Sequence, residues 1–203
     1  MKAIIEGMTF PFTVPQGFRI TPEQFEQLAE VEQTARLELT ANGELIVMSP
    51  TGGTAGKKNF NLYLDLGFWN RQTKLGVAFD SSTIFALPNG ARKSPDVSWV
   101  KLERWESLTL KEKQGFPPIA PDFVIELVSP SDLRTQRYQD LQNKMQEYLE
   151  NGVELGWLIE PSAKTVEIYR IGQQIEVLNN PLSLMGEAVL PGFTLDLKEI
   201  FTV

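Results

Sequence analysis

The feature that most constrains the fold of this chain is a short apolar run that contains one acidic residue. Residues 123–128 read Phe-Val-Ile-Glu-Leu-Val, and a continuous run of this kind is typical of a strand buried on both faces of a sheet. A second such run, residues 157–159, follows after a helical pattern. Two buried strands joined by a helix predict an α/β fold with a central mixed β-sheet flanked by helices.

The segments around these two strands predict a helix, a hairpin and further strands. Thr21 and Gln24 form a capping box at the start of a short helix. The Asn42-Gly43 pair between two apolar runs predicts a β-hairpin at 36–48. The other expected elements are a loop at 49–56, a helix at 57–74, strands at 76–87 and 94–100, a helical turn with a loop at 101–120, a helix at 132–151, and a closing hairpin at 164–171 and 174–179.

Two of these helices have apolar residues at helical spacing, which gives each helix an apolar side. In the first helix these residues are Phe25, Leu28 and Val31. In the second helix they are Phe60, Leu64, Phe68 and Leu75, with Leu62 and Leu66 beside them.

The length of 203 residues suits one domain. We expect residues 1–203 to form a single domain, in which 1–56 are an N-terminal helix and hairpin extension and 164–203 are a C-terminal hairpin and tail. The first twelve residues lack the continuous apolar region of a signal peptide, and no later stretch approaches membrane-spanning length. A cytoplasmic location is therefore the expectation.

The chain contains no cysteine and no histidine. Disulfides, thiolate or imidazole metal sites, and catalysis by Ser-His-Asp or Cys-His groups are thereby excluded. Acid, base and metal chemistry must come from carboxylates, lysines, tyrosines or water. A metal held by carboxylate oxygens is a hard cation, which favours Mg²⁺ or Mn²⁺ over Zn²⁺.

The net charge of −7 argues against a general nucleic-acid binder. The acidic excess lies in the two ends of the chain, whereas residues 51–150 carry thirteen basic and twelve acidic side chains. An ordinary acidic protein is the alternative interpretation of this composition.

Glu126 is the one charged residue of the apolar run at 123–128, and it shares a face of the expected strand with Val124 and Val128. A carboxylate in such a position is costly unless it is paired, hydrogen-bonded or bound to a metal. The alternative is a glutamate at a strand end that pairs with a nearby lysine or arginine.

Two further residues are candidates for the same site as Glu126. Asp96 follows Pro95 near the start of an expected strand, although Pro-Asp pairs are also common in turns. Lys144 lies on or beside the apolar face of the helix at 132–151, where it either extends to solvent or reaches a buried carboxylate cluster.

These segments, taken in order, resemble a known family. They are Ser-Pro-Asp-Val at 94–97, Pro-Asp followed by the apolar run and Ser-Pro-Ser-Asp at 121–132, Lys144 with Tyr148, and Trp-Leu-Ile-Glu-Pro at 157–161. Together with the hairpin that carries Glu38, they resemble the Uma-type family of the PD-(D/E)XK nuclease superfamily, over roughly residues 20–200.

The resemblance implies a restriction-endonuclease-like core with a magnesium site. It implies Asp96 and Glu126 as metal ligands, Lys144 as the catalytic lysine, and Glu38 as an extra ligand or orienting group. In the wider superfamily the lysine lies two residues after the glutamate, where this chain has Val128. The chain also departs from the family pattern at Ala55, where a histidine is frequent, and its hairpin at 36–44 is one residue longer.

Several basic side chains near these segments could contact phosphate groups. They are Lys57, Lys58, Arg92, Lys93, Arg134 and Arg137. The alternative for each of them is a solvated surface charge.

The resulting hypothesis is a Mg²⁺-dependent endonuclease that hydrolyses DNA phosphodiester bonds. A binding module that kept the fold with weak or no catalysis is the alternative, and hydrolysis of another phosphoester is a third possibility. DNA is the expected partner and a membrane is not. A homodimer is expected by analogy with nucleases that cut two strands with two subunits.

Overall fold

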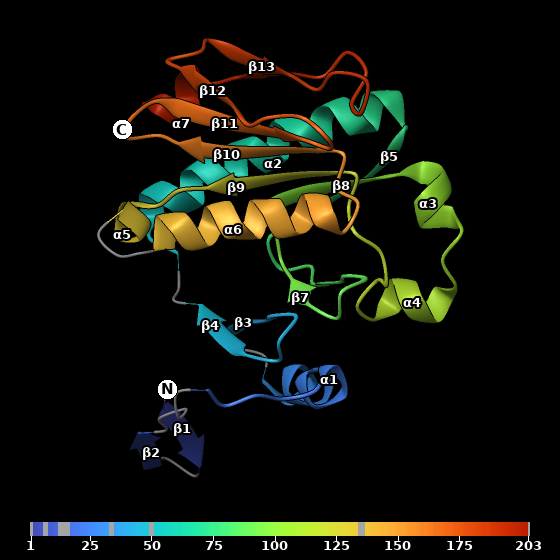
Figure 1. Ribbon diagram of the computed structural model, residues 1–203, viewed down its shortest axis with the longest axis vertical. Coiled ribbons are helices and arrows are strands. Elements are labelled where there is room, and N and C mark those ends of the chain that lie inside the picture. The colour runs from blue at the N-terminus through green and yellow to red at the C-terminus, as the bar shows by residue number, and fades with distance from the viewer. Residues whose placement is uncertain are drawn as a thin grey trace.

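The computed structural model describes residues 2–5, 8–11, 17–32, 35–48, 51–133 and 137–202, and the side chains of residues 2–5, 8–11 and 131 are not described. Its centre is a six-stranded sheet (Figure 1). The strands pair in the order β12 (Glu176–Asn179), β11 (Thr165–Arg170), β10 (Leu155–Glu160), β9 (Phe123–Leu127), β8 (Val97–Lys101) and β5 (Gly76–Asp80).

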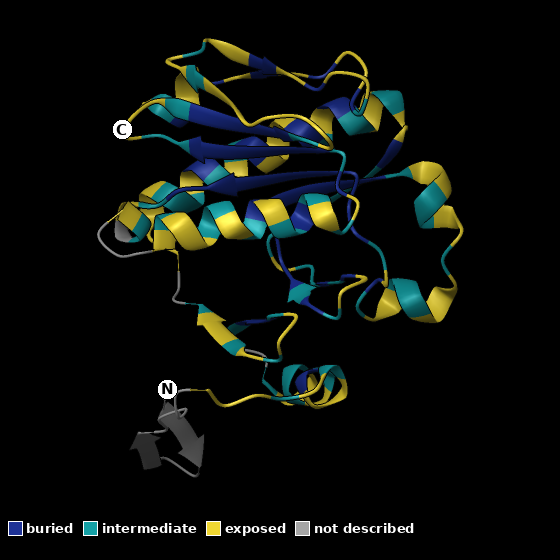
Figure 2. Cartoon of the chain, in the orientation of Figure 1, coloured by how far each residue is buried: buried dark blue, intermediate teal, exposed yellow. Residues whose placement is uncertain are grey.

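The sheet is mixed, because β9 and β10 run parallel while the other neighbours run antiparallel. All five residues of β9 are buried, so the apolar run at 123–128 forms the expected central strand (Figure 2). The crossover between the two parallel strands contains α5 (Pro130–Leu133) and α6 (Arg137–Glu150). The expectation of one helix over 132–151 is thus replaced by two helices, and residues 134–136 between them lie outside the described residues.

Two helical layers cover the sheet, one on each face (Figure 1). On one face α2 (Gly53–Thr73) packs with the C-terminal segment, which contains β13 (Ser183–Met185), β14 (Thr194–Asp196) and α7 (Lys198–Phe201). On the other face α6 packs through Met145 and Tyr148 against β9, β10 and β11. Alternation along β9 turns Glu126 toward the α6 face, with Val124 and Val128.

Gly156 of β10 leaves room for the end of the Met145 side chain of α6. A Cβ at this position would lie 2.5 Å from the Cε of Met145, which is a distance that real contacts do not show. A larger residue here would displace the end of Met145, and the glycine lets this side chain pack against β10.

A smaller sheet lies below α6 in Figure 1. Its strands pair in the order β4 (Leu45–Met48), β3 (Arg36–Leu39), β7 (Arg92–Lys93) and β6 (Phe85–Ala86). The predicted hairpin at 36–48 is confirmed, and Gly43 in its turn has a φ of +83°, which favours glycine. The single strand expected at 76–87 is wrong, because a turn after Asp80 sends β5 to the central sheet and β6 to the small one.

The remaining helices lie outside the two covering layers. The capping box of Thr21 and Gln24 starts α1 (Pro22–Val31) as predicted. Residues 101–120 form α3 (Leu102–Glu106) and α4 (Leu110–Gln114). A two-stranded antiparallel sheet of β1 (Lys2–Ile5) and β2 (Met8–Pro11) precedes α1 in the chain. No helix in the described part of the chain is long and apolar enough to cross a membrane.

The sheet covers only part of the apolar side of α2. Phe60, Leu64 and Phe68 are 62%, 53% and 63% exposed, whereas Leu62 and Leu66 are fully buried against the sheet. The helix also begins at Gly53, four residues before the expected start. Both stripes have helical spacing, so periodicity could not decide which of them the sheet covers. Val31, on the apolar side of α1, is 79% exposed.

This difference in burial predicts that two leucine substitutions in the same helix have effects of very different size on stability. Leu66→Ala should lower the free energy of unfolding by about 2–5 kcal/mol, because it leaves a cavity under the sheet. Leu64→Ala should change it by about 0.5 kcal/mol or less. Urea denaturation of both variants measures the difference, and equal losses would contradict the assignment of the two stripes.

Candidate active site

Lys144 of α6 lies between two buried carboxylates. Its Nζ is 2.8 Å from Oε1 of Glu126 on β9 and 2.8 Å from Oε1 of Glu38 on β3. It also donates a longer hydrogen bond of 3.4 Å to the carbonyl of Ser94. The expectation that Lys144 either extends to solvent or reaches a carboxylate cluster is resolved in favour of the cluster.

Both oxygens of Glu38 face cationic or amide groups. Oε1 accepts hydrogen bonds from Lys144 and, at 2.9 Å, from the backbone N–H of Ser94. Oε2 lies 4.0 Å from the ammonium of Lys93, which in turn pairs with Glu147 at 3.1 Å. Oε1 of Glu38 is therefore occupied by two donors, whereas Oε2 has only the more distant ammonium of Lys93.

Glu126 keeps one oxygen without such a partner. Its Oε1 accepts from Lys144 and from the hydroxyl of Tyr148 at 3.1 Å, while no group of the described chain donates to Oε2. The pKa of Glu126 is raised to about 7, because burial and the charges of Asp96 and Glu38 raise it more than the ammonium of Lys144 lowers it. Such a carboxylate gains from a further cation.

The charge of Lys144 is stabilised by the same contacts. Burial lowers its pKa, but the carboxylates of Glu126 and Glu38 raise it more strongly, so that the pKa lies above its ordinary value. Lys144 is therefore held as an ammonium in this arrangement. The pKa of the Tyr148 hydroxyl is also raised, first by burial and then by the charges of Glu126 and Glu38.

Asp96 lies directly before β8, at the end of the sheet where Glu126 lies. The register pairs Val97 with Ile125, and continued by one residue it places Asp96 opposite Glu126 on the neighbouring strand. Its Oδ2 accepts from the backbone N–H of Leu127 at 3.0 Å, and its Oδ1 accepts from the amide of Asn59 at 3.1 Å. Burial raises the pKa of Asp96, although these two hydrogen bonds and the charges of Lys144 and Arg36 lower it.

These residues fit a magnesium ion held by few protein ligands. Among the described residues no group of three or more acidic, histidine or cysteine side chains could hold a metal. Mg²⁺, however, is usually bound through one or two carboxylates, with water and phosphate oxygens completing the shell. Asp96 and Glu126 supply two carboxylates at the same end of the sheet, close enough for the charge of Asp96 to raise the pKa of Glu126. The side-chain amide oxygen Oδ1 of Asn59, beside Asp96, is buried with no hydrogen-bond partner in the described chain. It adds an unoccupied oxygen at this place.

Three residues of this cluster were not found from the sequence. Asn59 lies among polar residues of α2, and nothing in its spacing distinguishes it from a solvated asparagine. The backbone of Ser94 has no side-chain signal. Glu147 follows Lys144 by three residues on α6, which was a usable signal because such positions share a helix face.

A second polar contact anchors the first half of α6. Glu167 of β11 accepts hydrogen bonds from Tyr138 at 2.7 Å, from Gln142 at 2.8 Å and from Tyr169 at 2.5 Å. Through Leu158 of β10 the register places Glu167 in the same row as Glu126. One helix thus meets two buried carboxylates, and this fixes its position over the sheet.

The structure separates the candidate phosphate-binding residues into two groups. Arg92 pairs with Glu26 at 2.9 Å, and Lys93 is buried against Glu147, so both are used inside the domain. Lys57 and Arg137 are exposed. Lys58 is 8% exposed and makes no ion pair or hydrogen bond in the described chain. Arg134 lies outside the described residues.

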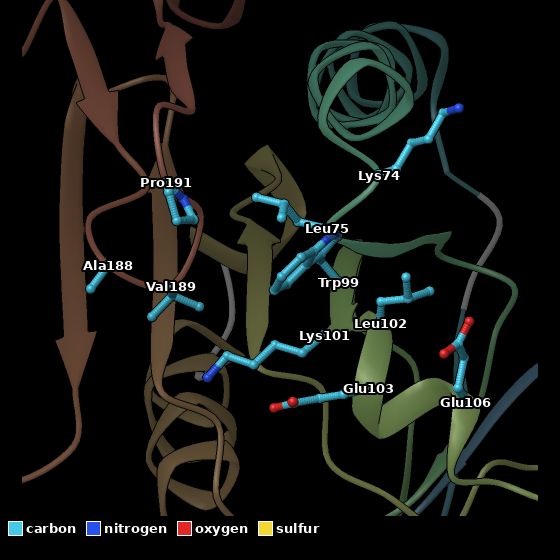
Figure 3. A pocket seen from close by; sticks show the side chains of 10 residues that line it. All are labelled: Lys74, Leu75, Trp99, Lys101, Leu102, Glu103, Glu106, Ala188, Val189 and Pro191. Carbon is cyan, nitrogen blue, oxygen red and sulfur yellow. The ribbon is translucent and has the colours of Figure 1, made fainter.

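A cavity of about 450 Å³ lies away from this cluster (Figure 3). Trp99 and Lys101 of β8 line it, whereas Asp96 precedes the opposite end of that strand. It contains none of the candidate residues.

The shared ammonium predicts a strong effect of removing it. Lys144→Met keeps the length of the side chain but leaves Glu38 and Glu126 buried without their cation. It should lower the free energy of unfolding by about 3–5 kcal/mol. Lys57→Met on the exposed start of α2 serves as the control, with a change of about 0.5 kcal/mol or less. Denaturant titration near neutral pH tests this, and equal stability of the two variants would contradict a buried ion cluster.

Comparison with known proteins agrees with this architecture. A crystal structure of a "putative nuclease belonging to DUF820" from Anabaena variabilis ATCC 29413 superimposes with a TM-score of 0.73 and 23% sequence identity. The match covers 90% of this chain and 97% of that chain, and it shows that the two share a fold. A search of curated proteins gives no match.

The expected family is confirmed by a family model. The Uma2 family, described as "Putative restriction endonuclease", matches residues 22–198, a range that contains all four clustered residues, Glu38, Asp96, Glu126 and Lys144. Because the match covers most of its length, the chain belongs to the Uma2 family.

Proposed function

We propose that this chain is a metal-dependent endonuclease that hydrolyses phosphodiester bonds of DNA. The observation that carries the proposal is the meeting of Lys144 with Glu126, beside Asp96, at one end of the central sheet. Membership of a family of nuclease type supports it. A chain that has no histidine and no cysteine must take its catalytic groups from carboxylates, lysines, tyrosines or a bound metal ion.

Asp96 and Glu126 would hold a Mg²⁺ or Mn²⁺ ion, which lowers the pKa of a bound water and polarises the phosphate. The two carboxylates suit this role, since each is held in place by protein donors and still has lone pairs that could bind a cation.

Lys144 would stabilise the negative charge that develops on the phosphoryl oxygens and orient the attacking water. A role as general base is less suited to it, because the two carboxylates raise its pKa. Glu38 would not bind the metal ion; it would hold the ammonium of Lys144 in place.

A binding module without catalysis is the second candidate. The net charge of −7 favours it, as does the pairing of Arg92 and Lys93 inside the domain, which removes two cations from a DNA-binding surface. A homodimer also stays a prediction.

Cleavage of plasmid and short duplex DNA distinguishes these candidates. The wild type should nick DNA only when Mg²⁺ or Mn²⁺ is present. Asp96→Ala and Lys144→Ala should each lose about 10²–10³-fold in rate, the size expected for removing one charge-stabilising group. Exposed Glu30→Ala and Lys111→Ala are the matched controls and should cleave as the wild type does.

An inactive wild type under varied metal and salt would move the conclusion to the binding module. Cleavage of small phosphoesters in place of DNA would keep the site and change the substrate. Full activity of Asp96→Ala would show that the nuclease activity resides elsewhere.

DNA binding offers a separate test of the basic residues. Lys58 carries an unpaired cation beside the first turns of α2, where four backbone N–H groups lack intrahelical partners. Burial lowers its pKa, so a phosphate would stabilise its charge. Lys58→Gln should weaken binding of a labelled duplex for all sequences and reduce the salt slope by about 1. Lys111→Gln is the control, and an unchanged slope for Lys58→Gln would exclude this contact.

A further inference from the structure

Asn59 of α2 is connected to the candidate site by one hydrogen bond. Its Nδ2 donates to Oδ1 of Asp96 at 3.1 Å, while the backbone N–H of Leu127 donates to Oδ2 at 3.0 Å. One donor on each oxygen fixes the plane of the carboxylate. Each oxygen keeps a lone pair that could bind a cation.

The other end of the same amide has no partner. Oδ1 of Asn59 is buried, and no group of the described chain donates to it. An ionised carboxylate only accepts hydrogen bonds, so Asp96 must face the NH₂ group and the amide oxygen is left over beside it. An unsatisfied buried acceptor costs about 1–3 kcal/mol, which a donor at this place would recover.

The other asparagines of α2 differ from Asn59. Oδ1 of Asn70 accepts from Nε1 of Trp99 at 2.8 Å, which satisfies it and ties α2 to β8. Asn61 makes no hydrogen bond within the described chain and has no buried orphan atom. The unsatisfied amide oxygen is therefore found at the asparagine that contacts Asp96.

We propose that Asn59 is a positioning residue of the metal site, an inference that rests on the proposed function. Its Nδ2 orients Asp96, and its Oδ1 accepts a hydrogen bond from a water molecule that the metal ion carries. Mg²⁺ and Mn²⁺ sites of this kind retain water, and a water bound to a cation is a strong donor. Partners of ligating carboxylates contribute strongly to metal affinity.

Calorimetric titration of Mn²⁺ into the whole 203-residue chain, without DNA, tests this inference. Asn59→Ala should weaken the affinity by about 10–100-fold. Asn61→Ala, the same change two residues further along the helix, should bind as the wild type does. Asp96→Ala should lose binding.

Thermal unfolding without metal separates this role from a structural one. Asn59→Ala loses the hydrogen bond to Asp96 but also removes the unsatisfied amide oxygen and introduces the best helix former, so it should melt at or near the temperature of the wild type. Asn59→Asp provides a second variant, because it restores an oxygen acceptor and adds a negative charge next to Asp96. It should melt lower without metal and bind Mn²⁺ more tightly than Asn59→Ala.

Two different failures are distinguishable. Asn59→Ala and Asn59→Asp that bind Mn²⁺ within about threefold of the wild type would overturn the role of Asn59 alone, since that lies below the lower limit expected for a partner of a ligand. A wild type that binds neither Mn²⁺ nor Mg²⁺ would overturn the proposed metal site together with this inference.

Discussion

The ammonium of Lys144, shared by the carboxylates of Glu38 and Glu126, is the interaction on which the arrangement of this protein depends. The two glutamates are 3% and 4% exposed, and a buried carboxylate without a partner would cost several kcal/mol. Each contact with Lys144 measures 2.8 Å. Because the three residues come from β3, β9 and α6, one cation fixes the small sheet, the central sheet and the covering helix relative to one another.

The same cluster places three carboxylates in different environments. Oε1 of Glu38 is occupied by Lys144 and the Ser94 N–H, which suits an orienting group. Glu126 retains Oε2 and Asp96 retains lone pairs on both oxygens, which suits metal ligands. The environment of each carboxylate distinguishes these tasks, since the side chains themselves differ little.

Placement of the lysine on a helix has a structural consequence. With Val128 at the position two residues after Glu126, the strand cannot supply the cation itself, and α6 must lie close and in fixed register to do so. Met145 packs against Gly156 of β10, and the hydrogen bonds from Tyr138 and Gln142 to Glu167 hold the first half of the helix. The geometry of the site therefore depends on residues that take no part in the proposed chemistry.

The sequence by itself determined the buried strand at 123–128, the hairpin at Asn42-Gly43 and the capping box at Thr21. In each case the signal is local, since apolar continuity, turn chemistry and capping act within a few residues. It also singled out Glu126, because a charge within an apolar strand requires a partner. Only the tertiary structure decided that the partner is Lys144, that Asn59 reaches Asp96, and that the sheet covers Leu62 and Leu66 while Phe60 and Leu64 stay exposed. These outcomes depend on which surfaces meet across distant segments, and helical spacing shows only that a face is apolar, whereas packing decides what covers it.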